Sequence, residues 1–261
     1  MQNPDGSPIW FELNTADTAK AREFYAATIG WTIAPTPMAE QGGYLIASAP
    51  DGAAIAGVAT PPPNAPSLPG WSIYFGTSDV DAAAAKVGDL GGSIQAGPMD
   101  IPGVGRFAIA TDPQHVSFML MTGASPDPSS AFLQGPHHGH GVWIELATPD
   151  PDAALAFYGA LFGWTREGAM PMGAMGDYIF LGSGEARHGA VMSSETTGAP
   201  ARWNWYAYVP DIDAAISTAT GLSGVLLQGP DQIPGGDYSA NIGDPTGAQI
   251  GMVGPRIGDA A

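Results

Sequence analysis

"IWFELNTADTAKAREFYAATIGW" spans residues 9–31 of this chain, and "VWIELATPDPDAALAFYGALFGW" spans residues 142–164. Aligned without a gap, the two stretches are identical at 11 of 23 positions and lie 133 residues apart. Self-similarity at a fixed offset indicates an internal duplication. We therefore expect the chain to build the same structural unit twice.

Later segments extend the duplication. "GPMDIPGVGRFA" (97–108) matches "GPDQIPGGDYSA" (229–240), and "DPQHVSFML" (112–120) matches "DPTGAQIGM" (244–252). Both pairs lie 132 residues apart, so the two copies are nearly colinear.

The duplication predicts two domains, at residues 8–122 and 141–254. The segment between them, 123–140, is rich in Pro, Ser and Gly, a composition typical of a linker.

Each half divides again into two similar units. "IWFELNT" alternates apolar and polar residues, which is typical of a strand. The next residues, 16–30, predict a helix with Asp17 as N-cap, a buried face around Phe24 and Tyr25, and Gly30 as its end. Short strands follow at 31–34, 44–48 and 54–59. The cycle restarts at "WSIYFGT", "VWIELAT" and "WNWYAYV", which predicts an α+β fold of four βαβββ units.

Composition narrows the classes of function. The formal charge is −17, and the eight Lys and Arg residues are scattered. Binding to nucleic acid or to an anionic membrane needs clustered cations, so neither is a predicted partner. The absence of Cys excludes disulfides, thiolate catalysis and Cys-ligated metals. Because neither a signal peptide nor a run of 18 apolar residues is present, we expect a cytoplasmic protein, either a monomer or a homodimer.

Paired βαβββ units resemble the vicinal oxygen chelate superfamily, which includes glyoxalase I, bleomycin-resistance proteins and extradiol dioxygenases. The resemblance rests on "FELNTADTAKAREFYAATIGW", "DVDAAAAKV", "IPGVGRFAIATDPQHVSFML" and their counterparts in the second half. It implies that paired units curve their sheets into a cup-shaped cavity. It leaves the chemistry open, because one fold carries many functions.

The resemblance also implies where metal ligands belong. In metal-dependent members they are His, Glu or Gln in the first and last strands of each unit. Alignment places those positions at residues that are not such ligands: Trp10, Ser72, Met119, Trp143, Asn204 and Gly251, with Gly57 and Val191 near the remaining two. We therefore predict no metal ion. No glycine run follows a strand and opens a helix, as a dinucleotide or phosphate site requires, so we predict no cofactor either. A register shifted by two residues would instead bring in Glu12 and Glu145 as ligands.

The His residues of the linker form a cluster, "HHGHG", with His137, His138 and His140. Such a cluster can hold a transition metal ion. We favour the interpretation that these residues are a solvated linker that collects metal only during purification.

Glu12 and Glu145 are the candidate catalytic residues. Each lies two positions after a Trp, so it shares that residue's strand face, which the resemblance directs into the cup. A partly desolvated carboxylate there can serve as a general base. The alternative is structural: each Glu bonds Tyr hydroxyls or backbone amides of a neighbouring strand.

The predicted ligand pocket is apolar with polar tips. Its candidate residues are Trp10, Tyr74, Arg106, Met119, Trp143, Tyr206 and Tyr208. Arg106 would bind a carboxylate at the mouth of the cavity, or else form a surface ion pair. The leading hypothesis is a metal-independent binder of a small apolar or aromatic ligand. The alternatives are a lyase or isomerase that uses Glu12 or Glu145 as base, and a divalent-metal enzyme whose ligands this register misses.

Overall fold

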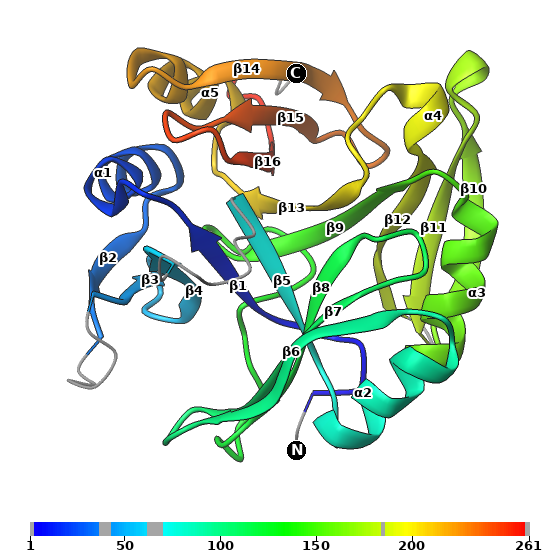
Figure 1. Cartoon of the computed structure of the whole chain (residues 1–261). Coiled ribbons are helices and arrows are strands. Elements are labelled where there is room, and N and C mark those ends of the chain that lie inside the picture. Colours follow the sequence, from blue (N-terminus) through cyan, green and yellow to red (C-terminus); the bar gives the residue numbers. More distant parts are fainter. Residues whose placement is uncertain (1–2, 37–42, 62–69, 184–185, 259–261) are drawn as a thin grey trace. The chain divides into compact units, whose positions relative to one another are not determined.

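The computed structural model of the chain describes residues 3–36, 43–61, 70–183 and 186–258. Four βαβββ modules follow one another along the chain, as the sequence predicts (Figure 1). No helix within these ranges is long and apolar enough to cross a membrane.

The first two modules make up the first half of the chain. The first module contains β1 (Pro8–Asn14), α1 (Thr18–Ile29), β2 (Thr32–Pro35), β3 (Leu45–Ser48) and β4 (Ala54–Ala59). The second contains β5 (Gly70–Gly76), α2 (Val80–Asp89), β6 (Ser93–Ile101), β7 (Gly105–Thr111) and β8 (Ser117–Gly123).

The last two modules repeat this order, with two short helices inserted in the third. The third module contains β9 (Gly141–Thr148), α3 (Pro151–Phe162), β10 (Thr165–Pro171), η1 (Gly173–Met175), β11 (Asp177–Ser183), β12 (Ala186–Ser193) and α4 (Ser194–Thr197). The fourth contains β13 (Arg202–Tyr208), α5 (Ile212–Gly221), β14 (Val225–Gln232), β15 (Tyr238–Gly243) and β16 (Gln249–Gly254).

The strands form two mixed sheets of eight strands each, with the orders β2-β3-β4-β1-β5-β8-β7-β6 and β10-β11-β12-β9-β13-β16-β15-β14. Within every module the first strand pairs in parallel with the last, and the remaining strand pairs described within the modules are antiparallel. The parallel pair is possible because the helix supplies a crossover between the two edges. The α+β class is confirmed.

Helix α1 begins and ends for the local reasons that the sequence indicates. The Asp17 carboxylate accepts a hydrogen bond from the Lys20 amide, which satisfies one free N–H of the first turn. Gly30 ends the helix in the left-handed region, at φ 86°. Phe24 and Tyr25 are fully buried, so the predicted core face is correct.

Contacts divide the chain into two compact units, and each unit takes modules from both halves of the sequence. One unit consists of Met1–Ile9, Ser72–Ser129 and Ile144–Asn204, and the other of Trp10–Trp71, Ser130–Trp143 and Trp205–Ala261. The second and third modules therefore belong largely to one unit, and the first and fourth to the other. The domain boundaries 8–122 and 141–254 stay a prediction about the sequence repeat.

A buried tyrosine joins two modules inside each unit. In one unit the Tyr25 hydroxyl donates to Asp244 Oδ2 at 2.8 Å and accepts from Trp71 Nε1 at 2.9 Å. Burial raises the pKa of Tyr25, with the charge of Asp244 adding to the effect. The hydroxyl therefore stays protonated and holds α1 of the first module to the loop before β16 of the fourth.

The other unit contains the same arrangement. The Tyr158 hydroxyl donates to Asp112 Oδ2 at 3.1 Å and accepts from Trp203 Nε1 at 3.0 Å. Tyr158 is fully buried, and this burial raises its pKa. Tyr25 and Tyr158 are repeated in the sequence because each contributes the same clamp to its own unit.

The predicted solvated linker is wrong for its last residues. His140 is 1% exposed, with Nδ1 2.6 Å from the Ser130 carbonyl and Nε2 3.0 Å from Asp51 Oδ2. His138 Nε2 lies 2.7 Å from the Ile29 carbonyl. Only His137 of the three is exposed. The segment packs because its imidazoles find acceptors on the first module, which no pattern within the segment itself indicates.

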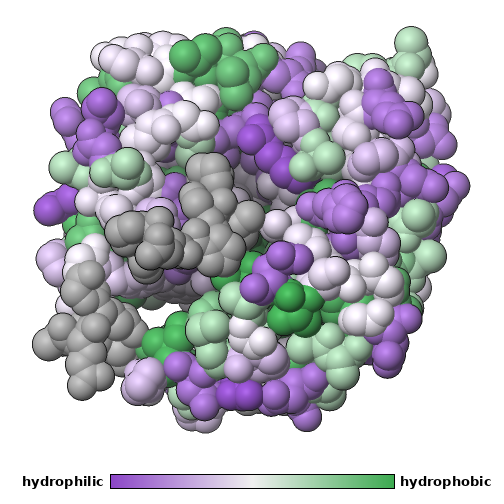
Figure 2. Space-filling view, in the orientation of Figure 1, coloured by the Kyte–Doolittle hydropathy of each residue, from purple (hydrophilic) through white to green (hydrophobic). Residues whose placement is uncertain are grey.

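Figure 2 shows one face of the molecule, on which hydrophilic residues alternate with separate apolar patches. Among the described residues, the large apolar side chains that are exposed are Met99, Met175, Val225, Leu226, Leu227 and Ile257.

Candidate functional site

The first module places Glu12 in a chain of hydrogen bonds on one face of β1. The Tyr44 hydroxyl donates to Glu12 Oε2 at 3.0 Å and accepts from Trp10 Nε1 at 3.1 Å. Trp10 and Glu12 therefore share a face, as strand alternation predicts. All three side chains are half-buried.

Tyr44 occupies the place where the family resemblance puts a ligand on the closing strand. Glu12 lies opposite Gly57 of β4, and a Cβ at Gly57 would overlap the Tyr44 hydroxyl. Burial raises the pKa of Tyr44 well above its usual value, and the charge of Glu12 adds to this. Tyr44 therefore remains a hydrogen-bond donor that fixes the carboxylate.

The third module repeats the carboxylate–tyrosine pair. The Tyr178 hydroxyl donates to Glu145 Oε2 at 2.8 Å, and Glu145 is 8% exposed. Glu145 lies opposite Ala190 of β12, where the first module has a glycine. Trp143, two residues before Glu145, is half-buried.

Sequence reasoning missed Tyr44 and Tyr178. The available signal was weak: "GYLIAS" and "DYIFLG" lie 134 residues apart and share the tyrosine. Their pairing with Glu12 and Glu145 depends on which strands are neighbours, so it follows only from the sheet order. Both pairs match the structural alternative, in which the Glu bonds a Tyr hydroxyl.

The second module presents an apolar row across its four strands. Tyr74 lies opposite Met119, Met119 opposite Ile109, and Ile109 opposite Ala96. Tyr74 and Met119 are 5% and 3% exposed. The Tyr74 ring also lies near Phe107, with centroids 6.3 Å apart. The structure thus brings two predicted pocket residues together on one face.

The fourth module presents a polar row at the same register. Tyr206 lies opposite Gly251, Gly251 opposite Asn241, and Asn241 opposite Gln228. Asn241 Nδ2 donates to the Tyr206 hydroxyl at 3.2 Å and to Gln228 Oε1 at 3.3 Å. Gln249 Nε2 donates to Asn241 Oδ1 at 3.1 Å. Of these residues, sequence reasoning named only Tyr206 and Gly251.

Tyr208 lies two residues after Tyr206 on β13, so the two share a strand face. It is half-buried, and burial raises its pKa, with the charge of Asp237 contributing. Its backbone pairs with that of Gly139 and His140, so the end of β13 is tied to the segment before β9.

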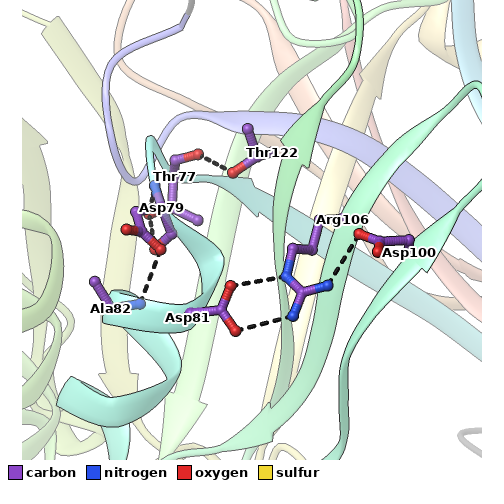
Figure 3. A network of polar contacts seen from close by, with 7 residues as sticks. All are labelled: Thr77, Asp79, Asp81, Ala82, Asp100, Arg106 and Thr122. Carbon is purple, nitrogen blue, oxygen red and sulfur yellow. Dashed lines mark hydrogen bonds and ion pairs between the residues drawn. The ribbon is translucent and has the colours of Figure 1, made fainter.

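The Arg106 guanidinium is already paired with two carboxylates of the protein, so it is not available to bind the carboxylate of a ligand. Its Nε and Nη2 bond Asp81 at 2.8 and 2.9 Å, and its Nη1 bonds Asp100 at 2.9 Å (Figure 3). Asp81 lies in the first turn of α2. The hydrogen bonds from Arg106 lower the pKa of Asp81, so this carboxylate stays charged. The structure shows the surface ion pair that was the alternative for this residue.

The arrangement of metal-ligating side chains bears on whether a divalent metal could bind in the part of the chain that the structure describes. No group of three or more His, Cys, Asp or Glu converges there. Zinc, manganese and iron sites need several such donors around one point. The carboxylates of Glu12 and Glu145 each face a tyrosine hydroxyl instead.

Comparison with known proteins identifies relatives along the whole chain. The family model of the Glyoxalase/Bleomycin resistance protein/Dioxygenase superfamily matches residues 8–120 and 141–252. CFP32 of Mycobacterium tuberculosis, named as a candidate glyoxylase, is 33% identical over 252 residues, which cover 96% of this chain and 95% of CFP32. The anthracycline biosynthesis protein DauV of Streptomyces sp. is 32% identical over 268 residues, covering 95% and 93%. DnrV of Streptomyces peucetius, which carries the same description, is 30% identical over 266 residues, covering 97% and 94%.

Solved structures share the fold at lower identity. The Mn(II)-bound glyoxalase of Novosphingobium aromaticivorans superposes with a TM-score of 0.65 at 17% identity, covering 96% of this chain and 82% of that one. Homoprotocatechuate 2,3-dioxygenase of Arthrobacter globiformis gives 0.64 at 14% identity, covering 98% and 83%. At such identities the likeness concerns the fold alone.

Proposed function

Because the chain belongs to the Glyoxalase/Bleomycin resistance protein/Dioxygenase superfamily, we propose that it binds a small, largely apolar or aromatic ligand without a metal ion. One observation carries the proposal: in the second module Met119, at a position where the family resemblance places a metal ligand, lies opposite Tyr74 in an apolar row. Both side chains are buried, and neither offers a lone pair that a hard divalent cation prefers. Such rows are apolar with a polar tip, the composition expected of a small-molecule site.

The names of two relatives support an aromatic ligand. DauV and DnrV are named for anthracycline biosynthesis, and anthracyclines are planar, fused-ring compounds that carry keto and hydroxyl oxygens. Exposed faces of Tyr and Trp stack on such rings. A planar aromatic compound is therefore the ligand class we propose for this chain.

The test is a titration of an anthracycline into the protein, followed by quenching of tryptophan fluorescence, with chelator present throughout. Saturable binding with a micromolar or lower Kd is expected, and Met119→Ala weakens it by about tenfold because a buried contact surface is lost. Lys20→Ala, on the exposed surface of α1, is the matched control and leaves the Kd unchanged. Absence of saturable binding by wild-type protein overturns the proposal.

A second candidate function is general-base catalysis, and Glu145 is the observation that favours it. Glu145 is 8% exposed, and the Tyr178 hydroxyl orients its carboxylate by a hydrogen bond of 2.8 Å. A buried and oriented carboxylate is the arrangement expected of a general base. The test first screens the wild-type protein for turnover of glyoxylase substrates and of anthracyclines, and then measures any turnover found in the Glu145→Gln variant. Loss of turnover with unchanged ligand affinity would support Glu145 as the general base. Unchanged turnover would leave Glu145 with a structural role.

The third alternative is a divalent-metal enzyme of the glyoxalase or dioxygenase kind. Its test is metal content: one tightly held ion per chain after chelator dialysis would establish it. Cytoplasmic residence, and the choice between a monomer and a homodimer, likewise stay predictions.

A further inference from the structure

This fold does not require the polar row of Tyr206, Asn241 and Gln228. The second module builds the same four-stranded sheet, with the same register, from Tyr74, Met119, Ile109 and Ala96. Burying a carboxamide costs free energy unless every polar atom finds a partner. A polar row where an apolar one suffices therefore calls for another explanation.

Asn241 is the centre of this row and is held in one orientation. It is 7% exposed and lies between Ala240 and Ile242, whose side chains point to the opposite face of β15. Gln249 donates to Asn241 Oδ1, which turns Nδ2 toward the Tyr206 hydroxyl and Gln228. In this orientation Nδ2 donates to both neighbours and Oδ1 accepts from Gln249.

The row runs from the interior to solvent. Tyr206 is 5% exposed, and its ring lies against Gly251, where a Cβ would overlap it. Gln228, at the other end, is exposed. The hydrogen bond from Asn241 Nδ2 to Gln228 Oε1 is 3.3 Å long. The buried donor Nδ2 is therefore covered by an exposed side chain that it bonds at long range. An incoming oxygen atom can take the place of Gln228 Oε1 without leaving any buried group unpaired.

We propose that Asn241 recognises a neutral oxygen, a keto or hydroxyl group, on the aromatic ligand. The proposal rests on the proposed function, and it assigns a polar ligand contact to the fourth module, separate from the row of Tyr74 and Met119 in the other compact unit. The row of Tyr206, Asn241, Gln228 and Gln249 contains only uncharged side chains, so it matches a carbonyl and not a carboxylate. In this arrangement Asn241 Nδ2 donates to the ligand, while Gln249 keeps the amide in orientation.

The test compares two probes of the same shape, anthracene and 9,10-anthraquinone, which differ by two keto oxygens. Wild-type protein should bind the quinone about tenfold more tightly, the effect expected of one partly buried hydrogen bond. Asn241→Leu should reduce this preference to about twofold or less. Gln228→Leu should keep it, because Gln228 covers the donor only in the free protein.

Gln95→Leu is the matched control. Gln95 lies on β6, the counterpart of β14, next to Ala96 of the apolar row. It is an exposed carboxamide whose Nε2 donates to Thr111 Oγ1. It should leave the preference unchanged. If Asn241→Leu does not fold, Gln249→Leu replaces it, and release of the Asn241 carbonyl should again lower the preference.

The outcomes separate this proposal from the function on which it rests. If wild-type protein binds both probes with equal affinity, or if Asn241→Leu keeps the preference, the role of Asn241 is overturned while aromatic binding stands. If neither probe binds, both the proposed function and the role of Asn241 fall.

Discussion

The second and fourth modules have the same strand order and the same register, yet their equivalent rows differ. Tyr74, Met119 and Ile109 cross one sheet, whereas Tyr206, Gly251 and Asn241 cross the other. Only the tyrosine is common to both. Since one row is apolar and the other rich in amides, the same strand order and register accommodate either kind of row.

The first and third modules show the opposite relation. Glu12 with Tyr44 and Glu145 with Tyr178 form the same pair in both. The buried Tyr25–Asp244 and Tyr158–Asp112 bonds are likewise duplicated. We expect the features kept in both copies to serve the folding of both compact units. Features that occur once are the better candidates for ligand recognition.

The largest expected effect is on stability, from removal of the buried aspartates. Asp244→Ala leaves the Tyr25 hydroxyl and the Ala248 amide without their acceptor, and should lower the free energy of unfolding by about 3 kcal/mol. Asp112→Ala should cost a similar amount, because it serves Tyr158 and Val116 in the same way. Chemical denaturation measures both. If one variant were near neutral, the two clamps would not be equivalent.

Gly57→Ala sharpens the comparison of the first and third modules. A methyl group at Gly57 overlaps the Tyr44 hydroxyl, so we expect a loss of about 2 kcal/mol from overpacking. The reverse change at the equivalent position, Ala190→Gly, should cost only about 1 kcal/mol, mainly through backbone entropy. Thermal unfolding curves of the two variants measure both losses. Equal losses would mean that Tyr44 and Tyr178 are packed alike.

Alkaline pH offers a third comparison. Burial raises the pKa of Tyr44 in the folded protein. At a pH between the ordinary tyrosine pKa near 10 and this raised pKa, the folded protein keeps the Tyr44 proton and the unfolded chain releases it. Stability from this group is therefore complete below about pH 10 and is lost as pH rises above it. Tyr44→Phe should make that decline shallower in a urea-unfolding series from pH 8 to 11, while Tyr25 and Tyr158 keep contributing to it. A profile that is unchanged by the substitution would contradict a buried hydroxyl.

Much of this framework was readable from the sequence, because it rests on local rules. Asp17 and Gly30 bound helix α1 as predicted, and strand β4 has its predicted bounds, Ala54–Ala59. Alternation alone placed Trp10 and Glu12 on one face. These features depend on residues close together in the chain.

What the sequence did not reveal depends on contacts between distant strands. Tyr44 reaches Glu12 across the sheet, and Asn241 meets Gln228 only through a register that is shifted by bulges. The burial of His140 depends on Ser130 and Asp51, which no pattern connects to it. The sequence leaves two fates open for Arg106, a carboxylate site or a surface ion pair. Its partners Asp81 and Asp100 lie on other elements, so only the structure decides between the two.

Glu12→Gln and Glu145→Gln should each change the free energy of unfolding by less than about 1 kcal/mol, since the amide oxygen still accepts the tyrosine hydrogen bond. Differential scanning calorimetry checks this. A loss several times larger in one variant would show that its negative charge, and not merely its acceptor, is needed in that module.

The smallest effect is expected at Arg106. Its ion pairs with Asp81 and Asp100 are largely exposed, and such pairs contribute about 0–1 kcal/mol. Arg106→Ala should therefore leave ligand affinity unchanged and alter the melting temperature only slightly. A clear loss of affinity for a carboxylate-bearing ligand would return Arg106 to the site.

The central claim is that aromatic binding needs no metal ion. Isothermal titration of an anthracycline into chelator-dialysed protein, with the metal content of the same sample measured by mass spectrometry, tests it directly. We predict less than about 0.1 ion per chain, the threshold for trace contamination of a metal-free site, and a Kd that added Mn(II) or Zn(II) does not change. Binding that disappears on dialysis and returns with one equivalent of metal would contradict the claim.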